Sequence, residues 1–122
     1  MRRTIFGFVF VTLLMSALFA PRLVAADDQQ DTTVVSIVEP AGGTPQDWTY
    51  VPGELSVAVG TPVTWTNTGA APHTVTSDDG VSFDSGNLDS QASFSFMPDS
   101  PGTFSYHCAY HPWMTGSLTV TS

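Results

Sequence analysis

One short stretch of this chain, Cys108 to Met114, has the residue types and spacing for metal chemistry, and it contains the only cysteine. His111 follows the cysteine after two residues, and Met114 follows the histidine after two more. One thiolate, two imidazoles and a weak axial methionine are the ligands of a type 1 (blue) copper site, which transfers electrons. The stretch therefore supplies three of four such ligands, and a second histidine must come from elsewhere.

That second histidine is identified by elimination among the three in the chain. His107 precedes the cysteine on a predicted strand, where successive side chains point to opposite faces, so we expect it to point away from the metal, at the surface or packed elsewhere. His73, in a loop bounded by proline, remains. The sequence thus predicts one copper ion, cycling between Cu(I) and Cu(II), with the ligands His73, Cys108, His111 and Met114.

Alternative interpretations of these residues are weaker. A lone buried cysteine is most often a small apolar residue, and an amphipathic helix would also bring the cysteine, histidine and methionine to one face. Pro112 would interrupt that helix and Gly116 follows it. Met97 competes for the axial position, but it precedes Pro98 at the end of a separate predicted strand, so Met114 is better placed.

Residues 1–26 are predicted to be a secretory signal peptide. Arg2 and Arg3 precede an apolar run, and the small residues Val24–Ala26 end it. A membrane anchor is the alternative, but the run is short for a spanning helix and Pro21 closes it. The arginine pair leaves the general and twin-arginine export routes open. We expect a periplasmic or otherwise extracytoplasmic protein, where a metal would protect the single thiol.

Residues 27–122 are predicted to form one domain with eleven carboxylates and neither Lys nor Arg, hence a formal charge of −11. Nucleic acid is disfavoured as a partner, because its binding depends on basic residues that neutralise phosphates. No stable membrane insertion is expected after signal cleavage. The charge suits steering toward a redox protein with a basic docking patch, or adaptation to high salt. We expect a monomer.

The domain is predicted to be all-β, because short β-forming runs alternate with Gly, Pro and Asp and helical periodicity is absent. The expected strands are residues 33–38, 55–59, 63–67, 73–76, 92–96, 103–108 and 116–121. Residues 40–50 and 77–90 are expected connections, either of which has room for a short strand. The aromatic residues expected in the core are Trp65, Phe94, Phe96 and Phe104.

Three segments resemble the cupredoxin family, most closely its amicyanin branch. They are VTWTN at residues 63–67 with the loop ending at His73, PGTFSYHC at 101–108, and HPWMTG at 111–116. Amicyanins share the short spacing between Cys, His and Met, whereas plastocyanins and pseudoazurins, more distant relatives, have a longer His to Met interval. The resemblance spans residues 50–121 and implies a Greek-key β-sandwich of about seven to eight strands, with type 1 copper at one end.

The resemblance also implies reversible single-electron transfer, with the edge of His111 as the electron port. Pro112, Trp113 and the Ala71–Pro72 pair could form an apolar ring around it, although Trp113 could equally belong to the core. Amicyanins commonly have Asn after the first histidine ligand, where this chain has Thr74. The steadying hydrogen bond is then either weaker or made by a hydroxyl, and we expect a shifted midpoint potential with copper retained.

We therefore expect an exported electron carrier that shuttles single electrons between redox partners, and not an enzyme. Its loop at residues 109–113 is short enough to hold the ligands stiffly, which lowers the reorganisation that accompanies each electron transfer. Copper storage or delivery in the cell envelope is the alternative, but delivery sites usually expose Met- and His-rich clusters. A copper enzyme would need an open coordination position or a second copper, and three histidines cannot furnish a further copper site.

Overall fold

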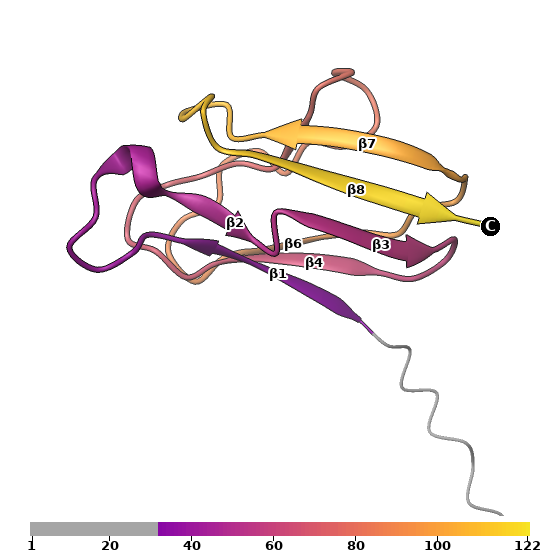
Figure 1. Cartoon of the computed structure of the whole chain (residues 1–122), viewed down its shortest axis with the longest axis horizontal. Helices are drawn as coiled ribbons and strands as arrows, with labels where there is room; N and C mark the ends of the chain where they lie inside the picture. Colours follow the sequence, from indigo (N-terminus) through magenta and orange to yellow (C-terminus); the bar gives the residue numbers. More distant parts are fainter. Residues whose placement is uncertain (1–31) are drawn as a thin grey trace, which may run out of the picture.

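The computed structural model describes residues 32–122, and the predicted signal peptide at residues 1–26 lies outside this range. The elements in chain order are β1 (Thr33–Val38), η1 (Pro45–Asp47), β2 (Thr49–Val51), β3 (Glu54–Ala58), β4 (Val63–Asn67), β5 (Thr76–Ser77), β6 (Ser93–Phe96), β7 (Gly102–His107) and β8 (Thr115–Thr121) (Figure 1). η1 is a single 3-10 turn. Within residues 32–122, no helix has the length and apolarity needed to cross a membrane.

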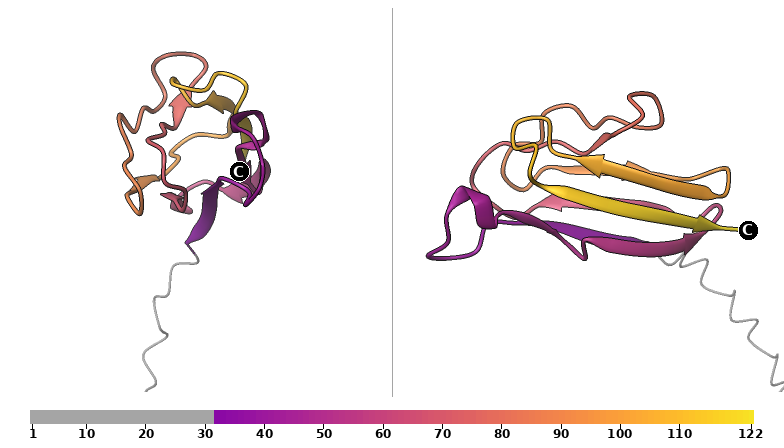
Figure 2. Two further views of the ribbon diagram at one scale, coloured as in Figure 1. Left: turned by 90° about the vertical axis from the view of Figure 1, so that its left-hand side faces the viewer. Right: turned by 45° about the horizontal axis from the view of Figure 1, so that its top comes forward.

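The eight strands form two four-stranded sheets, in the orders β2-β1-β4-β6 and β3-β8-β7-β5. The sheets lie over one another as the two layers of a sandwich (Figure 2). β1 runs parallel to β4, β3 runs parallel to β8, and the other pairs are antiparallel. The predicted all-β sandwich of seven to eight strands is confirmed.

The core lies between the sheets and follows the alternation expected of half-buried strands. In β4, Val63, Trp65 and Asn67 are buried while the intervening threonines are only partly buried. Trp65 is fully buried, as predicted, and its ring meets Tyr106 edge to face at 5.5 Å. The three phenylalanines predicted for the core are partly buried and pack against it: Phe94, Phe96 and Phe104.

The predicted strand at residues 73–76 is wrong in its position. β5 begins only at Thr76, and His73 forms an isolated bridge with Leu88, in which each backbone N–H donates to the other's carbonyl (3.1 and 2.8 Å). The backbone of residues 73–75 pairs instead with the connection that follows β5, where the Ser85 N–H also donates to the Val75 carbonyl (2.9 Å). His73 is fully buried in this segment. β2 occupies the end of the 40–50 connection, where room for a short strand was expected.

Three segments meet at one end of the sandwich, at the left of Figure 1, because β1, β4 and β7 all end there. Glu39 follows β1, residues 68–75 follow β4, and Cys108 follows β7. The predicted ligands are in the second and third of these segments. The fold thus brings residues from distant parts of the sequence together at a single edge.

Candidate metal centre

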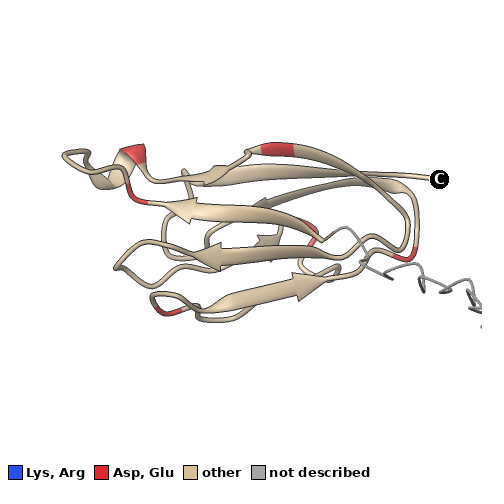
Figure 3. Cartoon of the chain, turned by 90° about the horizontal axis from the view of Figure 1, so that it is seen from below, with Lys and Arg blue, Asp and Glu red and all other residues tan. Residues whose placement is uncertain are grey.

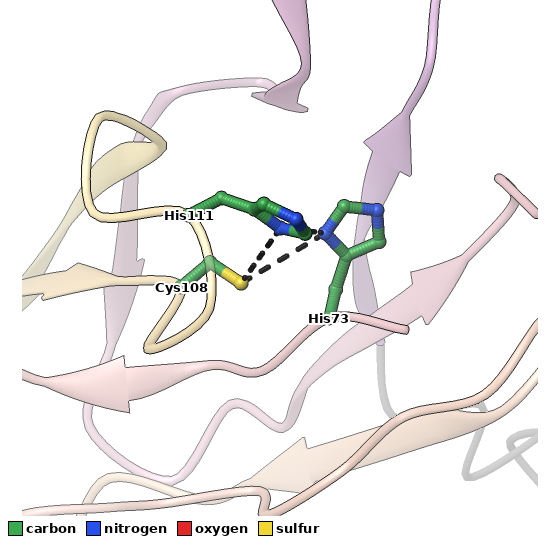
Figure 4. Close-up of side chains that lie close together, drawn as sticks. All are labelled: His73, Cys108 and His111. Atoms are coloured by element: carbon green, nitrogen blue, oxygen red, sulfur yellow. Dashed lines mark hydrogen bonds between the residues drawn. The ribbon is translucent and has the colours of Figure 1, made fainter. Parts of the chain in front are cut away.

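The side chains of His73, Cys108 and His111 converge at this end of the molecule, and Figure 4 shows them pointing toward one another. The Cys108 sulfur lies 3.8 Å from His73 Nδ1 and 3.5 Å from His111 Nδ1. The two Nδ1 atoms are 3.2 Å apart. His73 and Cys108 are fully buried, and His111 is partly exposed. Sequence reasoning had placed these three residues together, and the structure does so.

These separations fit a single metal ion bound by all three donors. With metal–ligand bonds of about 2.0–2.3 Å, nitrogen and sulfur donors arranged trigonally around one ion lie about 3.5–3.8 Å apart. The observed distances are within a few tenths of an ångström of that spacing. A trigonal His2Cys set with a weak axial ligand is the environment of blue copper. The residues therefore fit one copper ion.

The orientation of His73 is fixed from outside the donor cluster. Its Nε2 lies 2.9 Å from Glu39 Oε1. Burial opposes ionisation of Glu39, but hydrogen bonds from His73 and from the backbone N–H groups of Ala70 and Ala71 hold its pKa below the usual range. An ionised carboxylate can only accept, so we assign the His73 proton to Nε2. The lone pair on Nδ1 then faces Cys108, where a metal would accept it.

His111 is held by the tight loop that carries it. The His111 N–H donates to the Cys108 carbonyl (3.2 Å), and the Met114 N–H donates to the His111 carbonyl (2.8 Å). The Cys108 N–H in turn donates to the Met114 carbonyl (3.1 Å), which closes the loop on itself. Burial and the neighbouring His73 lower the pKa of His111 against the opposing effect of Glu39. Neutral imidazole, the form that binds metal, is thereby favoured.

Met114 lies at the end of this loop and is 1% exposed. Its backbone bonds to Cys108 and His111 tie it to two of the donor residues. Met97, the competing methionine, is 60% exposed and follows β6, whose end is paired with the start of β4, away from the end where the donors meet. The structure therefore retains Met114, and not Met97, as the residue that could serve as an axial ligand.

Thr74 contacts Cys108 from the side of the first histidine. Its backbone N–H donates to the Cys108 sulfur (3.3 Å). Its hydroxyl accepts a hydrogen bond from the Ala109 N–H (2.7 Å). The amicyanin resemblance left open whether the hydrogen bond of the usual Asn is weakened here or made by a hydroxyl. In the structure, the Thr74 hydroxyl links the two ligand loops.

His107 points away from the donors, as predicted from strand alternation. Its Nδ1 lies 2.6 Å from Asp78 Oδ1 in a pair at the molecular surface. Trp113, for which core and surface were both open, is 45% exposed, and its Nε1–H donates to the Pro45 carbonyl (2.8 Å). Neither residue contributes a donor atom to the cluster.

Two residues at the centre escaped sequence reasoning, Glu39 and Trp48. Trp48 packs edge-on against both imidazoles, with ring centroids 5.4 Å from His73 and 4.9 Å from His111. Glu39 is one of the eleven carboxylates counted in the sequence, and no motif distinguishes it from the others. Both lie in the connection after β1, where the sequence shows no recognisable motif. They are recognised as parts of the site only by their contacts with His73, and those contacts depend on how the strands pair.

Comparison with known proteins agrees with this geometry. The sequence profile of the cupredoxin-like domain matches residues 5–120. Amicyanin-alpha of Methylorubrum extorquens is 41% identical over 71 residues, which are 55% of this chain and 60% of that protein. The chain thus spans less than two thirds of the length of this curated relative.

Solved structures show the same architecture. The structure titled a novel purple cupredoxin from Nitrosopumilus maritimus superposes with a TM-score of 0.64 at 31% identity, covering 73% of this chain and 99% of that one. The Cu(I) form of a substituted amicyanin superposes with a TM-score of 0.63 at 30% identity, covering 74% and 82% respectively. Together with the matched profile and the convergent donors, these similarities establish that the chain belongs to the cupredoxin-like domain family.

Proposed function

We propose that this protein is an exported electron carrier that binds one type 1 copper ion through His73, Cys108 and His111, with Met114 as the axial ligand. The observation that carries the proposal is the convergence of one cysteine sulfur and two imidazole nitrogens within 3.2–3.8 Å of one another at the end of a β-sandwich. The Cu(I) form of the related amicyanin supports copper as the metal.

Copper, when bound, supplies a one-electron couple between Cu(I) and Cu(II). The protein's part is to keep the donors still, because ligands that move little lower the cost of changing oxidation state. The backbone bonds among Cys108, His111 and Met114 restrain one loop. The Thr74 bonds to Cys108 and Ala109 join that loop to the other. The arrangement therefore favours a reversible carrier over a site that releases its metal.

The most accessible donor is His111, which is partly exposed while the other three proposed ligands are buried. Two large aromatic side chains are exposed next to it in the same loop, Tyr110 at 49% and Trp113 at 45%. Aromatic residues with an apolar body and a polar tip are favoured at protein interfaces. We assign this loop as the face through which electrons enter and leave.

The partner is proposed to be a redox protein with a basic docking patch. The described residues carry no Lys or Arg, and Figure 3 shows acidic residues on several separate parts of the fold. Such a surface accelerates encounter with a positively charged protein, and salt screens the effect. The rate of electron exchange with a basic cytochrome should fall steeply as ionic strength rises. A salt-independent rate would exclude electrostatic steering.

Export and processing complete the proposal. The charged start, apolar run and small residues of segment 1–26 support cleavage there, release of a monomeric domain of residues 27–122, and a periplasmic or other extracytoplasmic location. This segment lies outside the described residues. Amino-terminal sequencing of the protein recovered from the cell envelope tests the cleavage position directly.

The test of the function is to load the purified protein with one equivalent of Cu(II) and record visible absorption and electron paramagnetic resonance spectra. An intense thiolate-to-copper band with narrow hyperfine splitting, bleached by ascorbate and restored by an oxidant, is the expected result. Repeated cycles should leave the metal in place. Loss of copper on reduction would favour storage or delivery, and a colourless protein would overturn the proposal.

A further inference from the structure

A carboxylate contacts the ring of His73 on the side opposite the donor cluster. The Glu39 side chain, 16% exposed, places Oε1 2.9 Å from Nε2 of the fully buried His73. The same carboxylate accepts hydrogen bonds from the backbone N–H groups of Ala70 (3.1 Å) and Ala71 (2.8 Å). One side chain therefore holds both the imidazole and the loop that leads to it.

The pairing of two strands places Glu39 at this position. β1 runs parallel to β4 in a register that sets Ile37 beside Asn67. The Thr68 N–H donates to the Ile37 carbonyl (3.1 Å), which continues the pairing past the end of β4. Glu39, two residues beyond Ile37, consequently lies beside the loop at residues 69–71. The contact follows from the sheet itself and not from a mobile surface side chain.

The fit around the carboxylate is close. A Cβ atom added at Gly69, a buried residue, would overlap the Glu39 side chain. The Asn67 side chain fixes the same loop by donating to the Ala71 carbonyl (2.8 Å) and accepting from the Gly69 N–H (3.0 Å). Glu39 thus occupies a space that a residue with a side chain at position 69 would close.

Resting on the copper function proposed above, we propose that Glu39 is a positioning residue that orients His73 and favours Cu(II) over Cu(I). A carboxylate that accepts from the distal N–H of a ligating histidine fixes the tautomer and ring orientation and raises ligand basicity. Its negative charge also stabilises the more highly charged ion more strongly. Both effects act through His73, and neither requires Glu39 to touch the metal.

The orienting role can be tested without copper. In the metal-free protein, long-range proton–nitrogen correlation spectra distinguish the two neutral tautomers of His73. We expect the Nε2–H form in the native protein and in Glu39→Gln, whose amide oxygen still accepts. Glu39→Ala and Gly69→Ala, which remove or displace the acceptor, should yield a mixture of tautomers. An unchanged, single tautomer in both of these variants would overturn the orienting role.

The electrostatic role is tested by redox titration of the copper-loaded protein. Asp99→Asn is the matched control, because Asp99 is exposed in the turn before β7, at the opposite end of the strand that leads to Cys108, and its loss changes the net charge equally. We expect Glu39→Gln to raise the midpoint potential more than the control does. Glu39→Ala should lower Cu(II) affinity about 10- to 100-fold. If the loss is tenfold and confined to Cu(II), the potential rises by about 59 mV.

Equal potentials for Glu39→Gln and Asp99→Asn would overturn the electrostatic role, whether or not Glu39→Ala folds. If the proposed copper function is wrong, the native protein itself will lack the blue chromophore. The tautomer of His73 in the metal-free protein would still show, in that case, whether Glu39 orients the imidazole ring. The two proposals can therefore fail independently.

Discussion

The two histidines of the centre are held in opposite ways. His73 is fully buried, bridges to Leu88 through its backbone and has its ring fixed by Glu39, which follows a different strand. His111 is partly exposed, and its own backbone N–H and carbonyl bond within a short loop, to Cys108 and Met114. One imidazole is therefore anchored by distant parts of the chain, and the other is anchored locally and faces the solvent.

This difference separates two requirements of an electron carrier. Under the proposed function, the buried histidine is the fixed donor, shielded from water, and the accessible histidine is the proposed path to a partner. Trp48 packs against both rings. Substitutions that act on only one of the two histidines test this difference between them most directly. A substitution of Cys108, which lies beside both histidines, should abolish the metal site as a whole.

The largest effect is expected from Cys108→Ser. The thiolate is the strongest donor of the set and is responsible for the blue colour, so the absorption band should disappear completely. The β-sandwich should remain, because a buried serine is close in size to cysteine, and circular dichroism provides that control. Retention of a normal blue band would refute the metal assignment for both histidines.

The contrast between the histidines predicts different responses to small external ligands. In His111→Gly, added imidazole should enter from solvent and restore a copper–thiolate band, since this side chain lies at the surface of the site. In His73→Gly, the same imidazole concentration should restore much less, because the vacated space is fully enclosed. Titrations of the visible spectrum with imidazole measure both. Equal rescue would show that burial does not distinguish the two positions.

Gly116→Ala is expected to disturb packing at the start of β8, the strand that follows the His111 loop. A Cβ atom at Gly116 would overlap the ring of Tyr106, which is fully buried. Overpacking of this kind typically costs about 1–3 kcal/mol. Thermal or denaturant unfolding of the metal-free protein measures the loss, with the exposed Thr115→Ala in the same strand as a control. An unchanged free energy of unfolding would contradict the close packing of β8 against the Tyr106 ring of β7.

The smallest effect is expected from Thr74→Asn, which alters the link between the two ligand loops. The backbone bond to the Cys108 sulfur should persist, while the hydroxyl that accepts from the Ala109 N–H is replaced by an amide. Copper should be retained and the midpoint potential should shift. Thr103→Asn, an exposed change in the strand that leads to Cys108, is the control. A potential equal to that of the native protein would argue against a tuning role for Thr74.

The parts of the centre that are close in sequence could be predicted from it. Cys108, His111 and Met114 lie within seven residues, and their spacing alone indicates the chemistry. His73 was found because the other remaining histidine, His107, is adjacent to the cysteine and must point to the opposite face. The sandwich followed from short β-forming runs, since alternation and turn residues are local signals.

The rest depended on contacts that no local pattern records. Glu39 reaches His73 only because β1 pairs with β4 in parallel, and parallel partners are separated by long connections. Trp48 is brought to the imidazoles by the connection before β2, which was expected to be irregular. The strand predicted to start at His73 begins only at Thr76, because the backbone of residues 73–75 pairs with residues 85–88 of the next connection, a contact that no local pattern records.

The absence of Lys and Arg from residues 27–122 also determines how the domain can be handled. A protease that cleaves after basic side chains finds no bond to cut there, folded or unfolded, so tryptic peptide mapping would miss the domain. Amine-directed cross-linkers and labels have no lysine to modify in it. Carboxyl-directed coupling is the route by which a complex with a redox partner could be trapped, because the single thiol, Cys108, is fully buried.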